Sequence, residues 1–438
     1  TIAVGASRTL QTNGADIVMW GGSAGGDGNF TVGNSACINT NSSCDVSSNS
    51  TSGGNIYMGG GVAGTTHPTG PIVNSTSGNA VSFGTGIDSG IRILSGGGDV
   101  EIRGASSSHG VSFWSGFTIK ATTGSITLAG TTSSSGQGVR IAASGTSTIA
   151  SAKTTGDAIT IAGNNTLSSP IANSNGLGIG YSVTQVNISA TGGGDVRLQG
   201  TVTNQGNVAS YFNNTNVTTT NSGNIFLASS GTYTSSGTGA INSSGNTSVT
   251  ASGITLGSAI TAGGTVGVLL KSDEMAINAD VSASNASGAV TISPLTNNLQ
   301  IDLGTETTGR LSLVDGELDR LIAGVVRIGE VGGANSGTIN ITAALTPGGT
   351  TSLALRTSGS VIGTDAGSIT ETNLAIHAAV VNLPGNNSIT GNLALVATGG
   401  TITYNQTSGT FTSNTVDSIA PVYGVPSKVV LSDVPTNQ

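Results

Sequence analysis

Apolar and polar residues alternate in short segments along the whole chain, and glycine-rich turns bound each segment. The clearest copy is Ser95–Gly104 (SGGGDVEIRG), which returns as Thr191–Gly200 (TGGGDVRLQG). Alternation with a period of two places Val100 and Ile102 on one face of a strand and Glu101 on the other. The segment therefore predicts a β-strand with one buried face and one solvated face.

Looser copies of this segment recur, and clusters of Gly, Ser, Thr and Asn between them supply turns. One such strand cannot bury its apolar face alone, whereas stacked copies can. A second set of short strands lies between the copies, which predicts a parallel β-helix with two or three strands in each coil of roughly 20–25 residues. We expect Ile102, Val196 and Ile292 to point inward. The looser copies lie at residues 53–58, 124–128, 156–161, 223–227, 288–292, 337–341 and 400–404.

The pattern divides the chain into four stretches of one elongated rod. Residues 1–52 form the first coils, with a projecting polar loop at residues 35–52, and residues 53–293 form the most regular helix. Residues 294–420 continue it through an irregular charged coil, in which Asp315–Leu321 predicts one helical turn capped by Asp315. Residues 421–438 contain three prolines and predict an exit segment or linker.

Composition narrows the possibilities further. The chain has 438 residues, of which 70 are glycine and 8% are charged, with a net charge of −8. Regularly spaced Val, Ile and Leu argue against disorder, and no helical periodicity is present. The thinly spread negative charge argues against nucleic acid or an anionic membrane as a partner. No apolar run approaches the roughly 18 residues of a membrane span. The chain begins without a methionine or a leader, so we expect a mature or excised piece.

The two cysteines, Cys37 and Cys44, lie seven residues apart in a Ser/Asn-rich stretch. A metal site would need further ligands, and no histidine is near in sequence. A local disulfide is the favoured interpretation, with two unpaired thiols as the alternative. Such a bond would imply an oxidising, extracytoplasmic location.

Several runs resemble repeats of the filamentous-haemagglutinin-like adhesins, which are large bacterial exoproteins of two-partner secretion. These runs are Ile301–Glu306, Leu311–Leu313, Glu317–Leu321 and the Leu-rich segments of residues 374–397, together with the Gly-Gly-Gly-Asp pattern upstream. The resemblance covers most of residues 53–410. It implies a right-handed parallel β-helix that is secreted through an outer-membrane partner of a Gram-negative bacterium, with roles in attachment, aggregation or biofilm formation. The family's N-terminal secretion domain is not evident, so the chain is similar to an internal or shaft portion.

Enzymes with a β-helix fold use carboxylates together with Arg or Lys on one strand face, and the candidate face here carries Asp99, Glu101 and Arg103. Alternating charges on an exposed strand usually solvate the surface, which favours the structural interpretation. A second charged set occupies residues 302–320, where salt bridges over an irregular coil explain it equally well. Gly21–Phe30 resembles the glycine-aspartate nonapeptides that bind calcium, but it occurs once, which favours a plain turn.

We therefore expect an extracellular structural or adhesive shaft rather than an enzyme, with no cofactor. Its expected partners are the secretion partner, cell-surface glycans and other copies of itself, joined end to end or laterally. Stacked Asn and Thr side chains in equivalent turns should form hydrogen-bonded ladders. The alternative is a β-helix that binds or cleaves polysaccharides.

Overall fold

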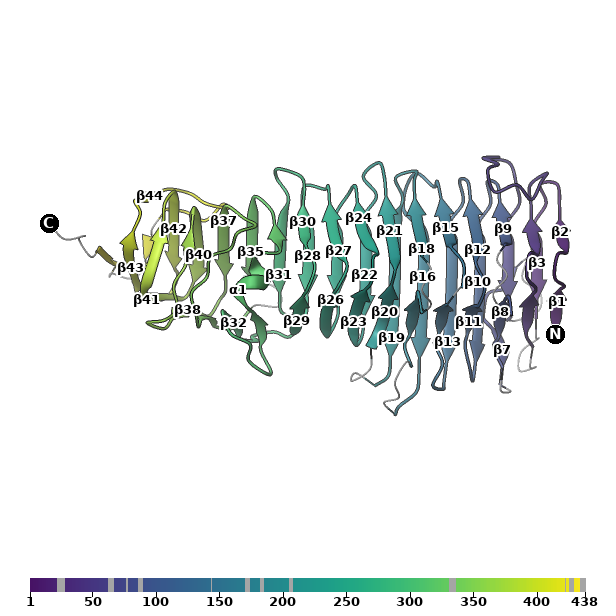
Figure 1. Cartoon of the computed structure of the whole chain (residues 1–438), viewed down its shortest axis with the longest axis horizontal. Helices are drawn as coiled ribbons and strands as arrows, with labels where there is room; N and C mark the ends of the chain where they lie inside the picture. Colours follow the sequence, from purple (N-terminus) through teal and green to yellow (C-terminus); the bar gives the residue numbers. More distant parts are fainter. Residues whose placement is uncertain are drawn as a thin grey trace. The chain divides into compact units, whose positions relative to one another are not determined.

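The computed structural model describes residues 1–21, 28–61, 67–75, 78–85, 90–142, 144–169, 174–181, 185–204, 208–330, 336–421, 423–424 and 429–433. Within these residues the regular secondary structure consists almost entirely of parallel β-strands, joined by turns and irregular segments (Figure 1). It divides into two compact units, Thr1–Thr247 (unit 1) and Ser248–Gln438 (unit 2), each described here by itself. Much of the expected exit segment, residues 421–438, lies outside the described residues.

Unit 1 is a parallel β-helix in which successive strands of a coil belong to three different sheets. The strands of each sheet pair in parallel with the equivalent strands of neighbouring coils. The predicted parallel β-helix is therefore confirmed. The first sheet contains β1 (Ile2–Val4), β4 (Phe30–Val32), β8 (Val81–Phe83), β11 (Val111–Phe113), β14 (Val139–Ile141), β17 (Leu177–Ile179), β20 (Val208–Asn213) and β23 (Thr232–Ser236).

The other two sheets of unit 1 are built in the same way. The second sheet contains β2 (Thr9–Gln11), β5 (Cys37–Asn39), β9 (Ile91–Ser95), β12 (Phe117–Ala121), β15 (Ser147–Ser151), β18 (Val186–Ala190), β21 (Thr215–Thr219) and β24 (Ala240–Ser243). The third sheet contains β3 (Ile17–Trp20), β6 (Ile56–Gly59), β7 (Ile72–Asn74), β10 (Val100–Ser106), β13 (Ile126–Thr132), β16 (Asp157–Asn165), β19 (Asp195–Val202) and β22 (Ile225–Ser229).

In the third sheet, the strand register places similar residues next to each other in successive coils. Ile102 pairs with Leu128, which pairs with Ile161, and that residue pairs with Leu198. All four side chains are at most 1% exposed. Because side chains alternate along a strand, each inward column of aliphatic side chains fills the interior while the next column faces solvent. The three side chains predicted to point inward, at positions 102, 196 and 292, are fully buried.

A column of glycines runs beside these aliphatic columns. Gly104, Gly130, Gly163 and Gly200 occupy the same register in β10, β13, β16 and β19. A Cβ atom on Gly163 would lie 2.0 Å from the carbonyl oxygen of Gly176, and the same close approach recurs at the other three. The backbone of the third sheet thus lies against the chain that leads into the first sheet, and only glycine leaves room for this contact.

Coil length varies more than the sequence suggests. Val100 pairs with Ile126 one coil later, whereas Ile159 pairs with Val196 across a much longer coil. Unit 2 contains both kinds of coil, since Val290 pairs with Val326 across a long coil and Leu374 pairs with Leu393 across a short one. The expected coil of roughly 20–25 residues is therefore too narrow a range, because the connecting segments change length while the paired strands keep their register.

Unit 2 begins with three strands per coil and continues with two. Its main sheet contains β28 (Gly267–Lys271), β31 (Ala289–Ser293), β35 (Val325–Gly329), β37 (Ser352–Arg356), β40 (Asn373–Ala378) and β42 (Asn392–Ala397), with β44 (Thr412–Ser413) and β45 (Tyr423–Gly424) at β42. The opposite sheet contains β32 (Ile301–Leu303), β33 (Leu311–Leu313), β36 (Ile339–Ile341), β38 (Ser360–Gly363), β39 (Thr370–Glu371), β41 (Val380–Ile389), β43 (Ile402–Ser408) and β46 (Val429–Asp433). The remaining strands are β26 (Gly253–Leu256), β27 (Ala259–Ala262), β29 (Glu274–Ile277), β30 (Val281–Ala283) and β34 (Leu321–Ile322), while β25 (Thr247–Thr250) contains the boundary between the units.

The expected helical turn is present as α1 (Asp315–Leu318), but Asp315 does not cap it. Val314 occupies the N-cap position, and its backbone N–H donates to the Glu317 carboxylate at 3.0 Å. The Asp315 carboxylate instead accepts hydrogen bonds from the backbone N–H and hydroxyl of Thr346. The prediction of an Asp315 cap is wrong because this side chain ties the helix to the following coil.

Candidate functional site

The predicted charged face on β10 consists of residues that already have partners. Glu101 and Arg103 form an ion pair on the outer face of the strand. The Asp99 Oδ1 atom accepts hydrogen bonds from the backbone N–H of Ser125 at 2.7 Å and from its hydroxyl at 2.8 Å. Asp99 therefore ties one coil to the next, at the turn that precedes each strand of the third sheet.

This contact belongs to a ladder of side chains that link successive coils. Asn55 donates its backbone N–H to the Asp16 carboxylate at 2.7 Å, and Asp99 donates its own backbone N–H to the Asn55 side chain at 2.8 Å. The second glycine-rich copy repeats the arrangement, because Asp195 accepts from the backbone N–H of Asn224 at 2.8 Å. Asn side chains also stack as predicted, since Asn216 donates to Asn187 at 3.0 Å and Asn392 to Asn373 at 3.1 Å, but the ladder at the Gly-Gly-Gly-Asp pattern is built from aspartate and asparagine rather than from threonine.

The charged residues of the irregular coil are likewise engaged with their neighbours. Asp302 has a side chain that is 2% exposed, and Arg310 donates to both of its carboxylate oxygens at 3.0 and 2.9 Å. Burial by itself would raise the pKa of Asp302, but hydrogen bonds from Asn340 and other donors outweigh it and lower that pKa. Glu317 accepts a hydrogen bond from the backbone N–H of Ile277 at 2.8 Å. These side chains bind the coil together rather than converging on an open site.

Cys37 and Cys44 are joined by a disulfide with a Cα–Cα distance of 6.3 Å. Cys37 lies in strand β5, so part of the stretch expected to be a loop belongs to the second sheet. The exposed remainder is held against the stack, because the Lys120 ammonium donates to the carbonyl oxygens of Val46 and Ser48 at 3.0 and 2.8 Å. The disulfide thus closes residues 37–44, and a lysine on β12 holds the residues that follow Cys44.

A groove lies on the outer face of the main sheet of unit 2, and the strand register explains its lining. One outward column contains Leu269, Thr291, Arg327 and then Ala354. A second column lies two residues further along each strand. It contains Lys271 on β28, Ser293 on β31, Gly329 on β35 and Arg356 on β37. Gly329 has no side chain, so the column is hollow at that point. The groove has a volume of about 450 Å³ and is lined by Leu269, Lys271, Thr291, Ser293, Arg327, Gly329, Glu330, Arg356, Asp417 and Ser418.

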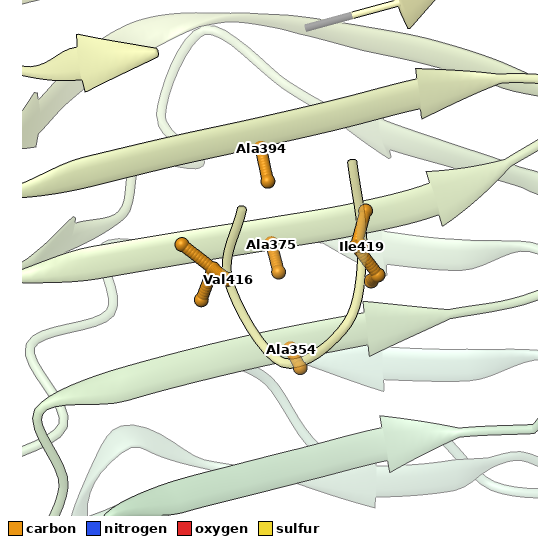
Figure 2. Packing of buried hydrophobic residues seen from close by; sticks show 5 residues of the cluster. All are labelled: Ala354, Ala375, Ala394, Val416 and Ile419. Carbon is orange, nitrogen blue, oxygen red and sulfur yellow. The ribbon is translucent and has the colours of Figure 1, made fainter. Parts of the chain in front are cut away.

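A short hairpin from near the end of the chain closes one side of this groove. We call it the strap, residues 416–419. Figure 2 shows that Val416 and Ile419 lie over three outward-facing alanines in register on β37, β40 and β42, namely Ala354, Ala375 and Ala394. All five side chains are buried. Each of the two larger side chains contributes about 1.5–3 kcal/mol by leaving water, and the alanines are small enough to let the hairpin approach the sheet.

The turn of the strap is a tight one that only unusual backbone conformations allow. Val416 and Ile419 exchange backbone hydrogen bonds of 3.1 and 2.8 Å, and the two residues between them, Asp417 and Ser418, have φ values of 47° and 63°. Positive φ at both central positions is characteristic of a type I′ turn. For residues other than glycine this costs on the order of 1 kcal/mol each, so other contacts must hold the turn.

Asp417 supplies those contacts, since its side chain is 4% exposed and lies between two guanidinium groups. Arg327 donates from Nε and Nη2 to both carboxylate oxygens at 2.6–3.0 Å, and Arg356 donates from Nη2 to Oδ2 at 2.7 Å. Burial alone would raise the pKa of Asp417, but the hydrogen bonds and charges of the two arginines outweigh it and lower that pKa. The Nε atom of Arg356 is buried and has no hydrogen-bond partner among the described residues. Lys271 and Glu330 form a longer pair across the groove at 3.5 Å.

Unit 1 has an outer feature of a different kind, a row of aromatic side chains along the first sheet. The Arg140 guanidinium lies 3.7 Å from the centroid of the Trp114 ring, and the rings of Tyr181 and Tyr211 are 5.0 Å apart. His109 lies against Trp114, and its pKa is lowered to about 4, first by burial and then by the charge of Arg140. The sequence did not identify the aromatic row or Asp417 as candidate site residues. Most of their contacts join residues from different coils, which leaves no local pattern in the sequence.

No group of three or more histidine, cysteine or carboxylate side chains is placed to hold a metal ion among the described residues. The run that resembles a calcium-binding nonapeptide lies largely outside them, since residues 22–27 are not described. Within the described residues, no helix reaches the length and apolarity that crossing a lipid bilayer requires. The sequence matches no family model, and no curated protein and no solved structure was found that matches it.

Proposed function

We propose that this chain is a structural and adhesive segment of a secreted or surface-exposed bacterial protein, of the kind found in filamentous-haemagglutinin-like adhesins. The observation that carries the proposal is the continuous register between coils within each unit, locked both by strand pairing and by side-chain ladders such as Asp16–Asn55–Asp99. Hydrogen bonds from every coil to the next resist bending and peeling, which suits a load-bearing extracellular role. The disulfide supports an oxidising compartment, and hence export.

Attachment would come from the outward faces, which carry many hydroxyl and amide groups. Each contact to a glycan or to another copy is weak, but repeated contacts on one molecule turn weak binding into firm attachment. Export through an outer-membrane partner and assembly with other copies belong to the same proposal.

The test is an attachment assay with the purified chain coupled to beads. We expect the beads to adhere to cells or to immobilised cell-surface glycans, and the soluble chain to compete. Analytical ultracentrifugation of the soluble chain measures self-association separately. The absence of both attachment and self-association would contradict the proposal.

Polysaccharide cleavage is the second candidate, because Asp99, Glu101 and Arg103 lie together on β10 and at the turn before it. Its test is the release of new reducing ends from a panel of acidic and neutral polysaccharides. Turnover that Asp99→Asn and Glu101→Gln both abolish would replace the adhesive proposal with an enzymatic one.

A further inference from the structure

The groove of unit 2 contains more positive than negative charge, although the chain as a whole carries −8. Lys271, Arg327 and Arg356 face Glu330 and Asp417, which leaves one excess positive charge at the groove. Asp417 is shared between two guanidinium groups, so a single carboxylate neutralises only one of them. The groove therefore has the charge to accept one further anionic group.

The donors in the groove are also incompletely used. In the part of the chain that the structure describes, the Nε atom of Arg356 is buried without an acceptor, while the Nη2 atom of the same side chain donates to Asp417. Nε itself has almost no accessible surface, but the Arg356 side chain is 30% exposed, so an anionic group in the groove can approach it and add to the contacts of the guanidinium. A planar carboxylate matches the fork of an arginine better than a spherical anion does.

The remaining lining residues are suited to hydroxyl groups. Thr291 and Ser418 present hydroxyls that both donate and accept, and Leu269 adds an apolar surface beside them. The groove crosses neighbouring strands of the main sheet, whose spacing of about 4.8 Å is close to the rise of one pyranose ring in an extended glycan. Its volume of about 450 Å³ is within the usual range for small-molecule sites.

We propose that this groove binds a saccharide that carries carboxylate groups. The carboxylate accepts from Arg356 and from Lys271, and the ring hydroxyls exchange hydrogen bonds with the hydroxyls of Thr291 and Ser418. The strap holds the site in shape, because the apolar contacts of Val416 and Ile419 fix the turn that presents Asp417 to the arginines. This proposal rests on the adhesive function only for the class of ligand, a glycan. The groove itself is a separate site within unit 2.

The experiment is calorimetric titration of the full chain with a glucuronate trisaccharide, alongside its methyl ester and a small tricarboxylate such as tricarballylate. We expect the trisaccharide to bind, its affinity to fall as salt is added, and both comparison ligands to bind at least about tenfold more weakly. The methyl ester keeps every ring hydroxyl but removes the charge, and tricarballylate keeps the charge without the rings.

Two variants locate the site. Lys271→Gln should weaken trisaccharide binding about tenfold without touching the strap, and Arg356→Lys should do so while keeping a positive charge beside Asp417. Lys153→Gln in unit 1 is the matched control and should leave binding unchanged. Circular dichroism melting shows whether each variant remains folded.

Several outcomes would overturn the proposal. These are the absence of any heat at millimolar trisaccharide, equal binding of the acid and its ester, equal or tighter binding of tricarballylate, and full binding by both groove variants. Failure of the bead assay with intact groove binding would instead refute only the adhesive function, and adhesion without groove binding would refute only this site.

Discussion

Replacing Gly163 by alanine should strongly destabilise unit 1, although it adds only one methyl group. The added Cβ would lie 2.0 Å from the carbonyl oxygen of Gly176 and 2.5 Å from its carbonyl carbon. Since ordinary van der Waals contact begins near 3.4 Å, the two backbone segments would have to move apart to make room for the methyl group. Both segments are held by pairing to the coils on either side, so they cannot separate without disturbing those coils.

The size of the effect follows from this geometry. Overpacking a well-packed interior costs about 1–3 kcal/mol, and a clash between two backbones belongs at the upper end, about 3 kcal/mol. For a unit of this size, 1 kcal/mol corresponds to roughly 2–4 °C in melting temperature, so we expect a fall of about 6–12 °C. Urea unfolding followed by circular dichroism measures the same change as a lower midpoint, and the slope shows whether unfolding remains cooperative.

The matched control is Ala162→Thr on the same strand. Ala162 faces outward beside Ala129 and Gln199, so the extra atoms meet solvent, and the change should stay within about 0.5 kcal/mol. If Gly163→Ala and Ala162→Thr unfold at the same midpoint as the parent chain, then the close approach of the two backbone segments does not exist.

Three further predictions concern other parts of the chain. Ile102→Asp places a carboxylate in the interior and should cost about 3 kcal/mol or more in urea unfolding; an unchanged midpoint would mean that the strand register is wrong. The intact mass of the non-reduced chain should be lower by two hydrogen atoms than after reduction, and alkylation of Cys37 and Cys44 without prior reduction would exclude their disulfide. The His109 ring should titrate by NMR with a midpoint of about 4, well below the unfolded value of about 6.5. Since the unfolded chain then binds more protons, the stability of unit 1 should decline as the pH falls from about 6.5 to about 4, whereas a midpoint near 6.5 would show that the ring is solvated.

The interior was predictable because its signal is local. Alternation within a single short segment identifies Val196 and Ile292 as inward, and both are fully buried. The pairing of strands then follows, because segments with the same pattern occupy equivalent positions in successive coils. The same alternation placed Glu101 and Arg103 on the outward face of β10, where the structure shows that they form an ion pair.

The contacts between coils were not predictable, because their sequence separation is not constant. Asp99 binds Ser125 one coil later, but coil length changes along the chain, so no fixed spacing relates a ladder residue to its partner. Asp417 is far from Arg327 in sequence, in a stretch that has no distinctive pattern. The groove therefore depends on a long-range pairing that only the folded chain reveals.

The variable coil length has a consequence for engineering. The coil from Ile159 to Val196 is longer than the coil from Val100 to Ile126, yet from Ile159 onward the paired strands stay in register, and the one shift lies at Asp157 before the core positions. Lengthening a connection costs little, about 0.6 kcal/mol for each doubling of a flexible loop. Foreign peptides grafted into the connections of unit 1 should thus be displayed at chosen coils, at intervals fixed by the strand spacing, without rebuilding the interior.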